Sequence, residues 1–526
     1  MSRLRPLSAV AALLTTSVLL LAGCSSGSGG GAADTATPDR EATLRIAYAG
    51  PTQSLDPAKQ GLTSSQPSTF LLYDRLTELG NDFVPKPMLA ESWQPAPDGS
   101  YLELKLRRGA TFHDGTPFDA AAVKANLERY KTLPGSTVAA VLTQVQGVDV
   151  VDPATVRLRL APGTGASLPV VLASNAGEMI SPKALADGRD LGSAPGDAGS
   201  GPYLVTGYRP NEMVTFERAP GTYWDPRAAS PKRIEISYVA AASTRMNALR
   251  SGQIDVAHVT GADVPAAQKI ADAGQAQATK VQTLVGRALY FRPGDPKFAD
   301  VRVRQAISHA VDRQAISTQL LAGNATPLVQ PYPPGHWANA PGLEDRMGHD
   351  PELAKRLLAE AGATGLSFQL AYTAGSPSFE PIAQVLQSQL AEAGITVTLQ
   401  PVPGGEADAG FREGRFETAL NSLNAVADPQ QQLAITYLGG LKGGEAVRDQ
   451  IAPLAAKADD PMLSQEQRGD IYRQIWTTVA EQASLVNLTG DQQIWLSSKK
   501  VTGVDAMPWT WAGNFDARYL GVGAAQ

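Results

Sequence analysis

Residues 366–402 carry the pattern that most limits how this chain can fold. An alternating apolar run over 366–372 precedes a helical pattern over 379–393, which stops at Gly394, and a second alternating run covers 395–402. Two strands joined by one helix pair in parallel through a right-handed crossover. The segment therefore predicts a parallel, doubly wound α/β sheet in the second half of the chain.

Other segments extend this α/β pattern. Asp300 is expected to start a helix that ends near Gly323, and Asp350, followed by Pro351, to cap the next one. With 526 residues, the chain is long enough for two or more domains. In the first half, Asp119 is expected to cap a helix, and alternating runs predict strands at 43–48, 102–106, 156–160, 203–208, 214–218 and 234–239.

The N-terminus has the features of an exported chain. Two arginines precede an apolar run over residues 7–21, which is too short to span a bilayer. The only cysteine, Cys24, ends a Leu-Ala-Gly-Cys sequence that resembles the bacterial lipoprotein signal. We expect residues 1–23 to be removed, Cys24 to carry a lipid, and residues 24–41 to form a flexible tether.

Composition and motifs exclude several function classes. The formal net charge is −6 and no Lys/Arg cluster is present, which argues against nucleic acid as a partner. No nucleophile elbow, phosphate-binding loop or zinc-protease motif occurs, so we predict that the protein is not an enzyme. The five histidines occur singly and the mature chain has no other thiolate, so we expect no metal site and no cofactor.

Several long blocks identify a family. "MLAESWQPAPDGSYLELKLRRGATFHDGTPFDAAAVKANLERY" at 88–130 resembles the signature block of the family 5 solute-binding proteins, the extracytoplasmic receptors of peptide/nickel-type ABC importers. "GSGPYLVTGYRPNEMVTFERAPGTYWD" at 199–225 resembles their Gly-x-Gly-Pro-Tyr block. Further blocks follow in the family's order at 242–259, 298–316, 350–362 and 382–399.

The resemblance implies a two-lobed periplasmic-binding-protein fold of class II with an extra inserted subdomain. It places lobe I at 42–286, the inserted subdomain at about 73–195, lobe II at 287–490, and a return to lobe I at 491–526. It implies a monomer on the outer face of the cell membrane, anchored through Cys24, that delivers its solute to a membrane permease.

The ligand is expected at the carboxyl ends of strands, where open α/β sheets bind their ligands. Thr52 and Gln53 follow the strand at 43–48, and Thr373 follows the strand at 366–372. Arg292 follows an apolar run over 288–291. The polar segment from Asn421 to Asp428, including Asn424, follows a run over 416–420.

Asp428 allows two interpretations. In the peptide-binding members of the family, an Asp-Pro in this segment pairs with the α-ammonium of the peptide. Here the upstream Trp and Tyr of those members are missing, and Asp428 is equally placed to cap a helix over 430–437. In the second case Asn421 and Asn424 would supply the polar contacts to the ligand.

The sequence thus predicts the binding component of an ABC importer that captures an organic solute, with a short peptide as the first choice. A non-peptide solute of the opine, oligosaccharide or metal-chelate type is the alternative, as is a surface receptor that presents its ligand to a partner protein. A secreted hydrolase is the third class, and the missing nucleophile–base motifs argue against it.

Overall fold

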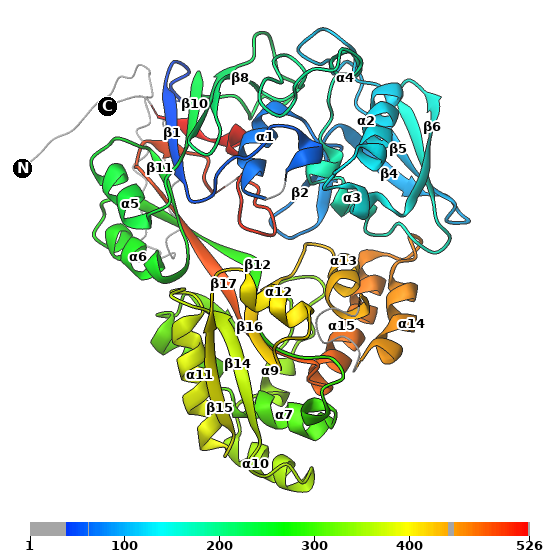
Figure 1. Ribbon diagram of the computed structural model, residues 1–526. Helices are drawn as coiled ribbons and strands as arrows, with labels where there is room; N and C mark the ends of the chain where they lie inside the picture. The colour runs from blue at the N-terminus through cyan, green and yellow to red at the C-terminus, as the bar shows by residue number, and fades with distance from the viewer. Residues whose placement is uncertain (1–37, 61–62, 440–446, 506, 524–526) are drawn as a thin grey trace, which may run out of the picture. The chain divides into compact units, whose positions relative to one another are not determined.

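One mixed β-sheet is the central feature of the computed structural model, which describes residues 38–60, 63–439, 447–505 and 507–523 (Figure 1). Within these ranges the sheet has 11 strands, in the order β15, β14, β16, β12, β17, β11, β1, β10, β9, β8, with β13 paired to β17. The strands are β1 (Thr43–Tyr48), β8 (Tyr203–Arg209), β9 (Met213–Arg218), β10 (Arg233–Tyr238), β11 (Val256–Val259), β12 (Gln277–Phe291), β13 (Ala325–Pro327), β14 (Ser367–Thr373), β15 (Thr396–Val402), β16 (Thr418–Asn424) and β17 (Leu485–Ser497).

Two long antiparallel strands, β12 and β17, join the two halves of this sheet. Strands β11, β1, β10, β9 and β8 follow on one side, and β16, β14 and β15 on the other. The ladder between β12 and β17 is interrupted between Gln282 and Gly286, and Gly286 then lies opposite Gly490. A side chain on Gly286 would overlap the carbonyl oxygen of Thr489, so the two backbones approach closely at this point.

The first half confirms the predicted strands. β1 pairs in parallel with β10 and β11, and its alternate residues Leu44 and Ile46 are buried in the largest hydrophobic cluster. The chain before β1 belongs to the same structure, because the amide of Asp39 donates to Val522 O at 2.7 Å. The tether expected to reach residue 41 therefore ends earlier. Cys24 and the signal segment lie outside the described residues.

A smaller sheet is inserted after the first helix of the chain. Its order is β4, β5, β7, β6, and all pairs are antiparallel. Asp119 caps the helix that covers it, accepting from Ala122 N at 2.9 Å as the sequence predicted. The elements of this segment are α1 (Gln66–Leu72), β2 (Thr77–Leu79), β3 (Pro85–Pro87), β4 (Ala90–Pro95), β5 (Tyr101–Leu106), α2 (Ala120–Thr132), β6 (Val145–Asp152), β7 (Thr155–Leu160), α3 (Leu168–Val171) and α4 (Pro182–Ala186).

In the second half, the predicted strand–helix–strand unit is present as β14, α11 and β15, and the two strands pair in parallel. Asp350 caps α10, and Gly362 follows its end with φ 66°. Helices cover both faces of the sheet here (Figure 1). The helices described in this half are α7 (Val301–Ala310), α8 (Arg313–Ala315), α9 (Leu343–Arg346), α10 (Pro351–Glu360), α11 (Glu380–Glu392), α12 (Glu406–Arg412), α13 (Pro429–Gln432), α14 (Arg448–Ala458) and α15 (Gln465–Glu481).

One predicted helix boundary is wrong. The helix that starts at Asp300 was expected to reach Gly323, but α7 ends at Ala310 and Val311 is extended. Asp312 then starts a new turn, because its carboxylate accepts from Ala315 N at 2.8 Å. A capping carboxylate inside an apolar helical pattern competes with the continuing helix and ends it.

The remaining short elements complete the first half. Helices α5 (Ala242–Arg250) and α6 (Val264–Asp272) pack on β11 and β17. Near the C-terminus, β18 (Val501–Thr502) pairs with β19 (Gly521–Val522). Between them, Arg518 is fully buried, 2.7 Å from Asp74 and 3.0 Å from Asp516. This cluster ties the last described residues to the segment that leads into the inserted sheet.

Candidate functional site

The carboxyl ends of strands from both halves meet at the interruption between β12 and β17. Val259, the last residue of β11, lies opposite Ile494, and Asn424, the last residue of β16, lies opposite Val285. β1 runs parallel to β11, and β14 runs parallel to β16, so their carboxyl ends point to the same region. Because ligands of open α/β sheets bind at such ends, this region is the candidate site.

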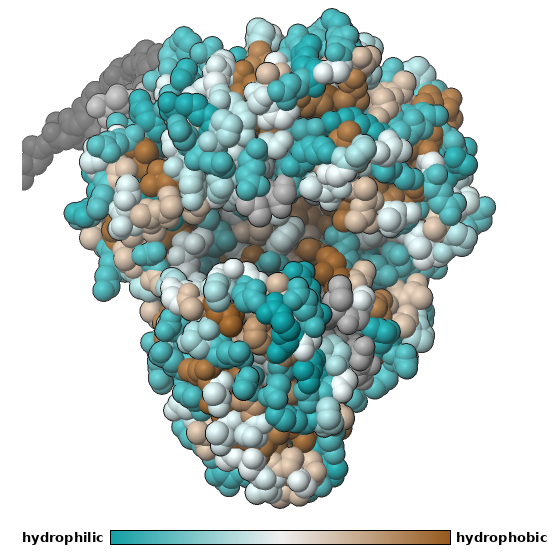
Figure 2. Space-filling view, in the orientation of Figure 1, coloured by the Kyte–Doolittle hydropathy of each residue, from teal (hydrophilic) through white to brown (hydrophobic). Residues whose placement is uncertain are grey.

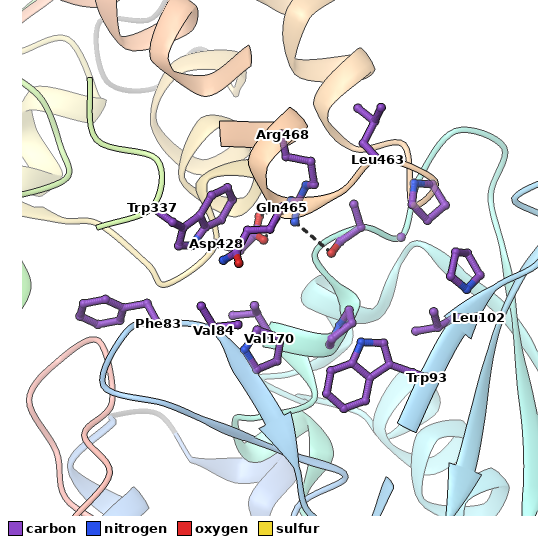
Figure 3. A pocket seen from close by; sticks show the side chains of 16 residues that line it. Phe83, Val84, Trp93, Leu102, Val170, Trp337, Asp428, Leu463, Gln465 and Arg468 are labelled. Atoms are coloured by element: carbon purple, nitrogen blue, oxygen red, sulfur yellow. Dashed lines mark hydrogen bonds and ion pairs between the residues drawn. The ribbon is translucent and has the colours of Figure 1, made fainter. Parts of the chain in front are cut away.

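The first of two cavities here has a volume of about 320 Å³. Figure 3 shows Trp337, Asp428, Leu463 and Arg468 on one side, and Phe83, Val84, Trp93, Leu102 and Val170 on the other. The first group comes from the second half of the chain and the second group from the inserted segment. We call this cavity the first chamber. Its size and its aromatic lining are typical of a small-molecule site.

The second cavity, the second chamber, has a volume of about 410 Å³. Residues 279–282 of β12, residues 333–336 and the segment around Trp509 line it, together with Asn81 and Phe83. It therefore lies beside the interruption in the β12–β17 ladder. Phe83 lines both chambers. Figure 2 shows this face hollowed between the upper and the lower part of the molecule, with hydrophobic residues inside the hollow.

Asp428 lies in the wall of the first chamber and is fully buried. Its Oδ1 accepts from Gln430 N at 2.8 Å, which is the helix cap that the sequence allowed. The sequence did not predict its second partner. Arg468 Nη2 on α15 lies 3.0 Å from Oδ2 and 3.2 Å from Oδ1. The carboxylate is thus neutralised by a residue of the same chain.

Arg468 uses its other donors to hold the two sides of the chamber together. Nε donates to Ala458 O at 2.9 Å, and Nη1 donates to Ala166 O at 3.2 Å across the cavity. The amide of Ala166 in turn donates to Asp459 O at 3.3 Å. The turn before α3 is therefore linked by hydrogen bonds both to Arg468 on α15 and to Asp459 at the end of α14.

A second carboxylate, Asp459, lies beside this pair. Burial and the charge of Asp428 raise the pKa of Asp459 to about 7, although Arg468 opposes the shift. Its Oδ1 is buried and has no hydrogen-bond partner. The guanidinium of Arg468 forms its ion pair with Asp428, and near neutral pH the carboxyl group of Asp459 is partly protonated.

Aromatic rings form the surface between the chambers. The ring of His336 stacks on Tyr332 with centroids 4.1 Å apart and lies 5.3 Å from the ring of Phe83. Burial lowers the pKa of His336 to about 3, so this imidazole is neutral at physiological pH. The guanidinium of Arg468 lies 5.4 Å from the ring of Trp337. Such rings offer stacking contacts and apolar area to a ligand.

Most of the residues predicted from strand ends lie outside the two chambers. Thr52 is buried and pairs with Ser68 Oγ at 2.8 Å, while the Gln53 amide donates to Ser65 Oγ at 3.2 Å. Thr373 ends β14 at the expected edge of the sheet. None of the three lines either chamber, and their role in binding stays a prediction.

The two asparagines lie within β16, which extends to Asn424 instead of ending near Leu420. Asn421 shares a face with Ala419 and Leu423, which lie in one hydrophobic cluster with residues of α15 and of the turns that follow α13. Asn424 lies three residues further along the strand, so it points to the opposite face. The two amides therefore cannot meet one ligand from the same face.

The structure places Arg292 away from the two chambers, and its role in binding stays a prediction. Arg292 follows β12, which runs antiparallel to β16. It therefore lies beside the start of β16 at Thr418 and not beside the end of β16 at Asn424. There Arg292 pairs with Asp295 at 2.6 Å and donates to Gly414 O at 3.2 Å. It is therefore at the edge of the sheet opposite to Thr373 and Asn424, and it does not reach the chambers.

Within the described ranges, no cluster of His, Cys, Asp and Glu side chains has the arrangement of a metal site. In the same ranges, no helix combines the length and the hydrophobicity needed to cross a bilayer. The chemistry of the two chambers is thus that of apolar and aromatic contact, backbone hydrogen bonds and a few charged groups. Groups of this kind suit contact with a small organic molecule.

Comparison with known proteins agrees with this class. Residues 84–444, more than half of the chain, match the model of the bacterial extracellular solute-binding proteins, family 5. The chain belongs to this family. It is therefore an extracytoplasmic solute-binding protein of the kind that serves ABC importers, and at the level of the family its role is to bind solutes and not to convert them.

Three relatives illustrate the similarity. The glutathione-binding protein GsiB of Salmonella choleraesuis is 28% identical over 478 residues, which cover 86% of this chain and 90% of GsiB. The ABC transporter substrate-binding protein CtaP of Listeria monocytogenes has a TM-score of 0.80 at 22% identity, with 92% and 100% of the chains covered. AgaA of A. tumefaciens R10, solved with agropinic acid, has a TM-score of 0.70 at 26% identity, with 92% and 99% covered. The two-lobed α/β fold class predicted from the sequence is confirmed.

Proposed function

We propose that the protein captures a short peptide or a peptide-sized organic solute in the first chamber and delivers it to an ABC permease. The observation that carries this proposal is the chamber itself. It is lined from both halves of the chain by apolar and aromatic side chains, and it shares Phe83 with the second chamber, which lies beside the ladder interruption. A closing cleft of this kind excludes water, which strengthens each hydrogen bond to the ligand.

The size of the chamber and one relative support the peptide class. A volume of about 320 Å³ is at the lower end of the range for ligand sites and suits a molecule of two or three amino-acid residues. GsiB, which covers 86% of this chain at 28% identity, binds a tripeptide, glutathione. Capture at micromolar Kd requires about 8 kcal/mol, which a buried aromatic site of this size can supply.

A non-peptide solute is the second candidate, and the pair of Asp428 with Arg468 favours it. In the peptide-binding members of the family this aspartate is the partner of the ligand's ammonium. Here it is fully buried and already neutralised. A solute without a free amino group, such as an opine, would need no free carboxylate at this position.

Native mass spectrometry of freshly purified protein tests the proposal, since a cleft of this kind retains its ligand. We expect a retained solute with the mass of a short peptide, followed by micromolar binding of glutathione or trialanine in calorimetric titrations. A retained mass that fits an opine or a sugar, with no heat from either peptide, would overturn the peptide class and support the second candidate.

We also propose that Cys24 carries the lipid that keeps the protein at the outer face of the membrane. The motivation is the position of the only cysteine directly after Leu21, Ala22 and Gly23. Cys24→Ala, expressed in the parent bacterium, should be released from the membrane fraction or remain as an unprocessed precursor. Normal processing with unchanged membrane fractionation would rule the anchor out.

A further inference from the structure

Phe83 is the residue that separates the two chambers. It is the only side chain of the described residues that lines both of them, and it is half-buried between the inserted segment and residues 333–337. Its ring faces His336 at 5.3 Å, and Figure 3 shows it opposite Trp337. A solute that extends from the first chamber into the second must pass this ring.

The backbone of Phe83 has an unusual conformation. Its φ is 59°, in the left-handed region that bulky residues rarely adopt. The turn between β2 and β3 imposes this conformation, because Phe83 N donates to Gly80 O and Gly80 N donates to Val84 O, both at 2.9 Å. Strain of this kind is found at ligand sites where the surroundings hold a residue in place.

The turn is itself fixed to the rest of the fold by Asn81. Its Oδ1 accepts from Trp509 N at 3.0 Å, and its Nδ2 donates to Met507 O at 3.3 Å. The turn therefore cannot move away from the wall of the second chamber without breaking both bonds. The ring of Phe83 is therefore held between the chambers by the hydrogen bonds of its own turn and by those of Asn81.

The two chambers differ in the groups that they present. The first has Trp93, Trp337 and the neutralised pair of Asp428 and Arg468 in its wall. The second has the exposed side chain of Lys280 in its lining, whereas the amide groups of Gln282 and Asn81 already have partners within the chain. A longer solute would find apolar contact in the first chamber and a charged partner in the second, but only if the ring between them moved.

We infer that Phe83 sets the length of the solute that the protein accepts. With the ring in place, the first chamber holds a peptide of two or three residues and excludes the part of a longer chain that would enter the second chamber. This inference rests on the proposed function, because it assumes a peptide-like solute in the first chamber. It adds to the proposed function a residue that determines specificity and a limit on the length of the solute.

Calorimetric titration with dialanine, trialanine and pentaalanine tests it on the full-length protein. The wild type should bind trialanine at least tenfold more tightly than pentaalanine. Phe83→Ala joins the chambers and should bring the two affinities within threefold of each other. Phe83→Gly removes the ring and also relieves the left-handed strain, so it should give the same result in a fold at least as stable.

Trp93→Ala is the matched control, because Trp93 lines the first chamber alone. It should weaken all three peptides by a similar factor and leave their ratio unchanged. The inference is overturned if Phe83→Ala or Phe83→Gly, folded by circular dichroism, keeps the tenfold preference of the wild type. If the wild type binds none of the peptides, the proposed peptide class itself fails, which is a different result from an unchanged preference.

Discussion

Arg468 Nη2 lies 3.0 Å from the Asp428 carboxylate, and neither side chain is more than 8% exposed. The pair joins the first turn of α15 to the cap of α13, residues that are 40 positions apart in the sequence. Because the carboxylate is satisfied by a cap and a guanidinium, the wall of the first chamber is complete before any solute enters.

The first prediction concerns binding. Asp428→Asn keeps the shape of the side chain and a capping oxygen but removes the charge. Since the carboxylate already has a cationic partner, we expect the affinity for the retained solute to change less than threefold in calorimetric titration. Pairing with a ligand ammonium would instead cost about 2–5 kcal/mol, or roughly 30-fold and more.

Asp350→Asn is the control for this substitution. Asp350 caps α10 through Leu353 N at 2.8 Å and lines neither chamber. Asp428→Asn should also unfold at a lower urea concentration than Asp350→Asn, because it leaves the buried guanidinium of Arg468 without its anionic partner. A loss of 30-fold or more with Asp428→Asn alone would show that the carboxylate holds an amine after all.

The second prediction concerns stability. Arg468→Met removes the guanidinium and leaves Asp428 buried without its partner, which typically costs about 3–5 kcal/mol. Urea unfolding followed by circular dichroism measures the difference in the free energy of unfolding between the variant and the wild type.

Arg346→Met is the comparison, because Arg346 pairs with Glu481 at 3.1 Å with both side chains half exposed. Exposed pairs contribute about 1 kcal/mol or less. Equal losses in the two variants would contradict a structural role for the buried pair.

Local signals predicted the local structure well. Caps at Asp119 and Asp350 and the stop at Gly394 gave correct helix ends, because a cap depends on residues within one turn. The alternation over 366–372 and 395–402 gave two correct strands, and the helix between them fixed their parallel pairing. These features require no knowledge of distant residues.

The site depends on relationships that no local pattern contains. The apolar run over 288–291 indicates a strand, but it does not give the direction of that strand relative to its neighbours, so the prediction for Arg292 named the wrong edge of the sheet. Arg468 looks like any arginine on a helix surface until α15 packs against Asp428. Residue 83 is a phenylalanine and not a glycine or asparagine, so its own identity does not indicate the left-handed backbone. Gly80-Asn81-Asp82 before it indicates a turn, and that was the one usable signal.

The third prediction uses the pKa of Asp459. Burial raises this pKa to about 7 in the folded protein, above its ordinary value near 4, so the folded state binds the proton more tightly. The stabilisation that the protonated carboxyl group of Asp459 gives to the folded state is complete below about pH 4 and is lost as the pH rises through 7. A shift of about three pKa units corresponds to at most roughly 4 kcal/mol.

Asp459→Asn removes this titration. We expect the variant to be more stable than the wild type at pH 8 and to lose that advantage toward pH 4, as measured by urea unfolding at each pH. Glu178→Gln should behave similarly, because burial raises the pKa of Glu178 to about 8. Asp98→Asn, in an exposed turn, should show no such gain at pH 8. A pH-independent difference between Asp459→Asn and the wild type would contradict the raised pKa.

The fourth prediction concerns the interruption between β12 and β17. Gly286 lies against the carbonyl of Thr489, so a methyl group there would force the two backbones apart where both halves of the sheet meet. We expect Gly286→Ala to lower the free energy of unfolding by about 1–3 kcal/mol, the usual cost of overpacking. We also expect weaker solute binding, since the second chamber, which shares Phe83 with the first, lies beside this point. Gly404→Ala is the control, because its added methyl group meets no atom within 4 Å and its backbone is not left-handed. If Gly286→Ala matches Gly404→Ala in both urea unfolding and calorimetric titration, the close approach of the two strands has no part in either stability or binding.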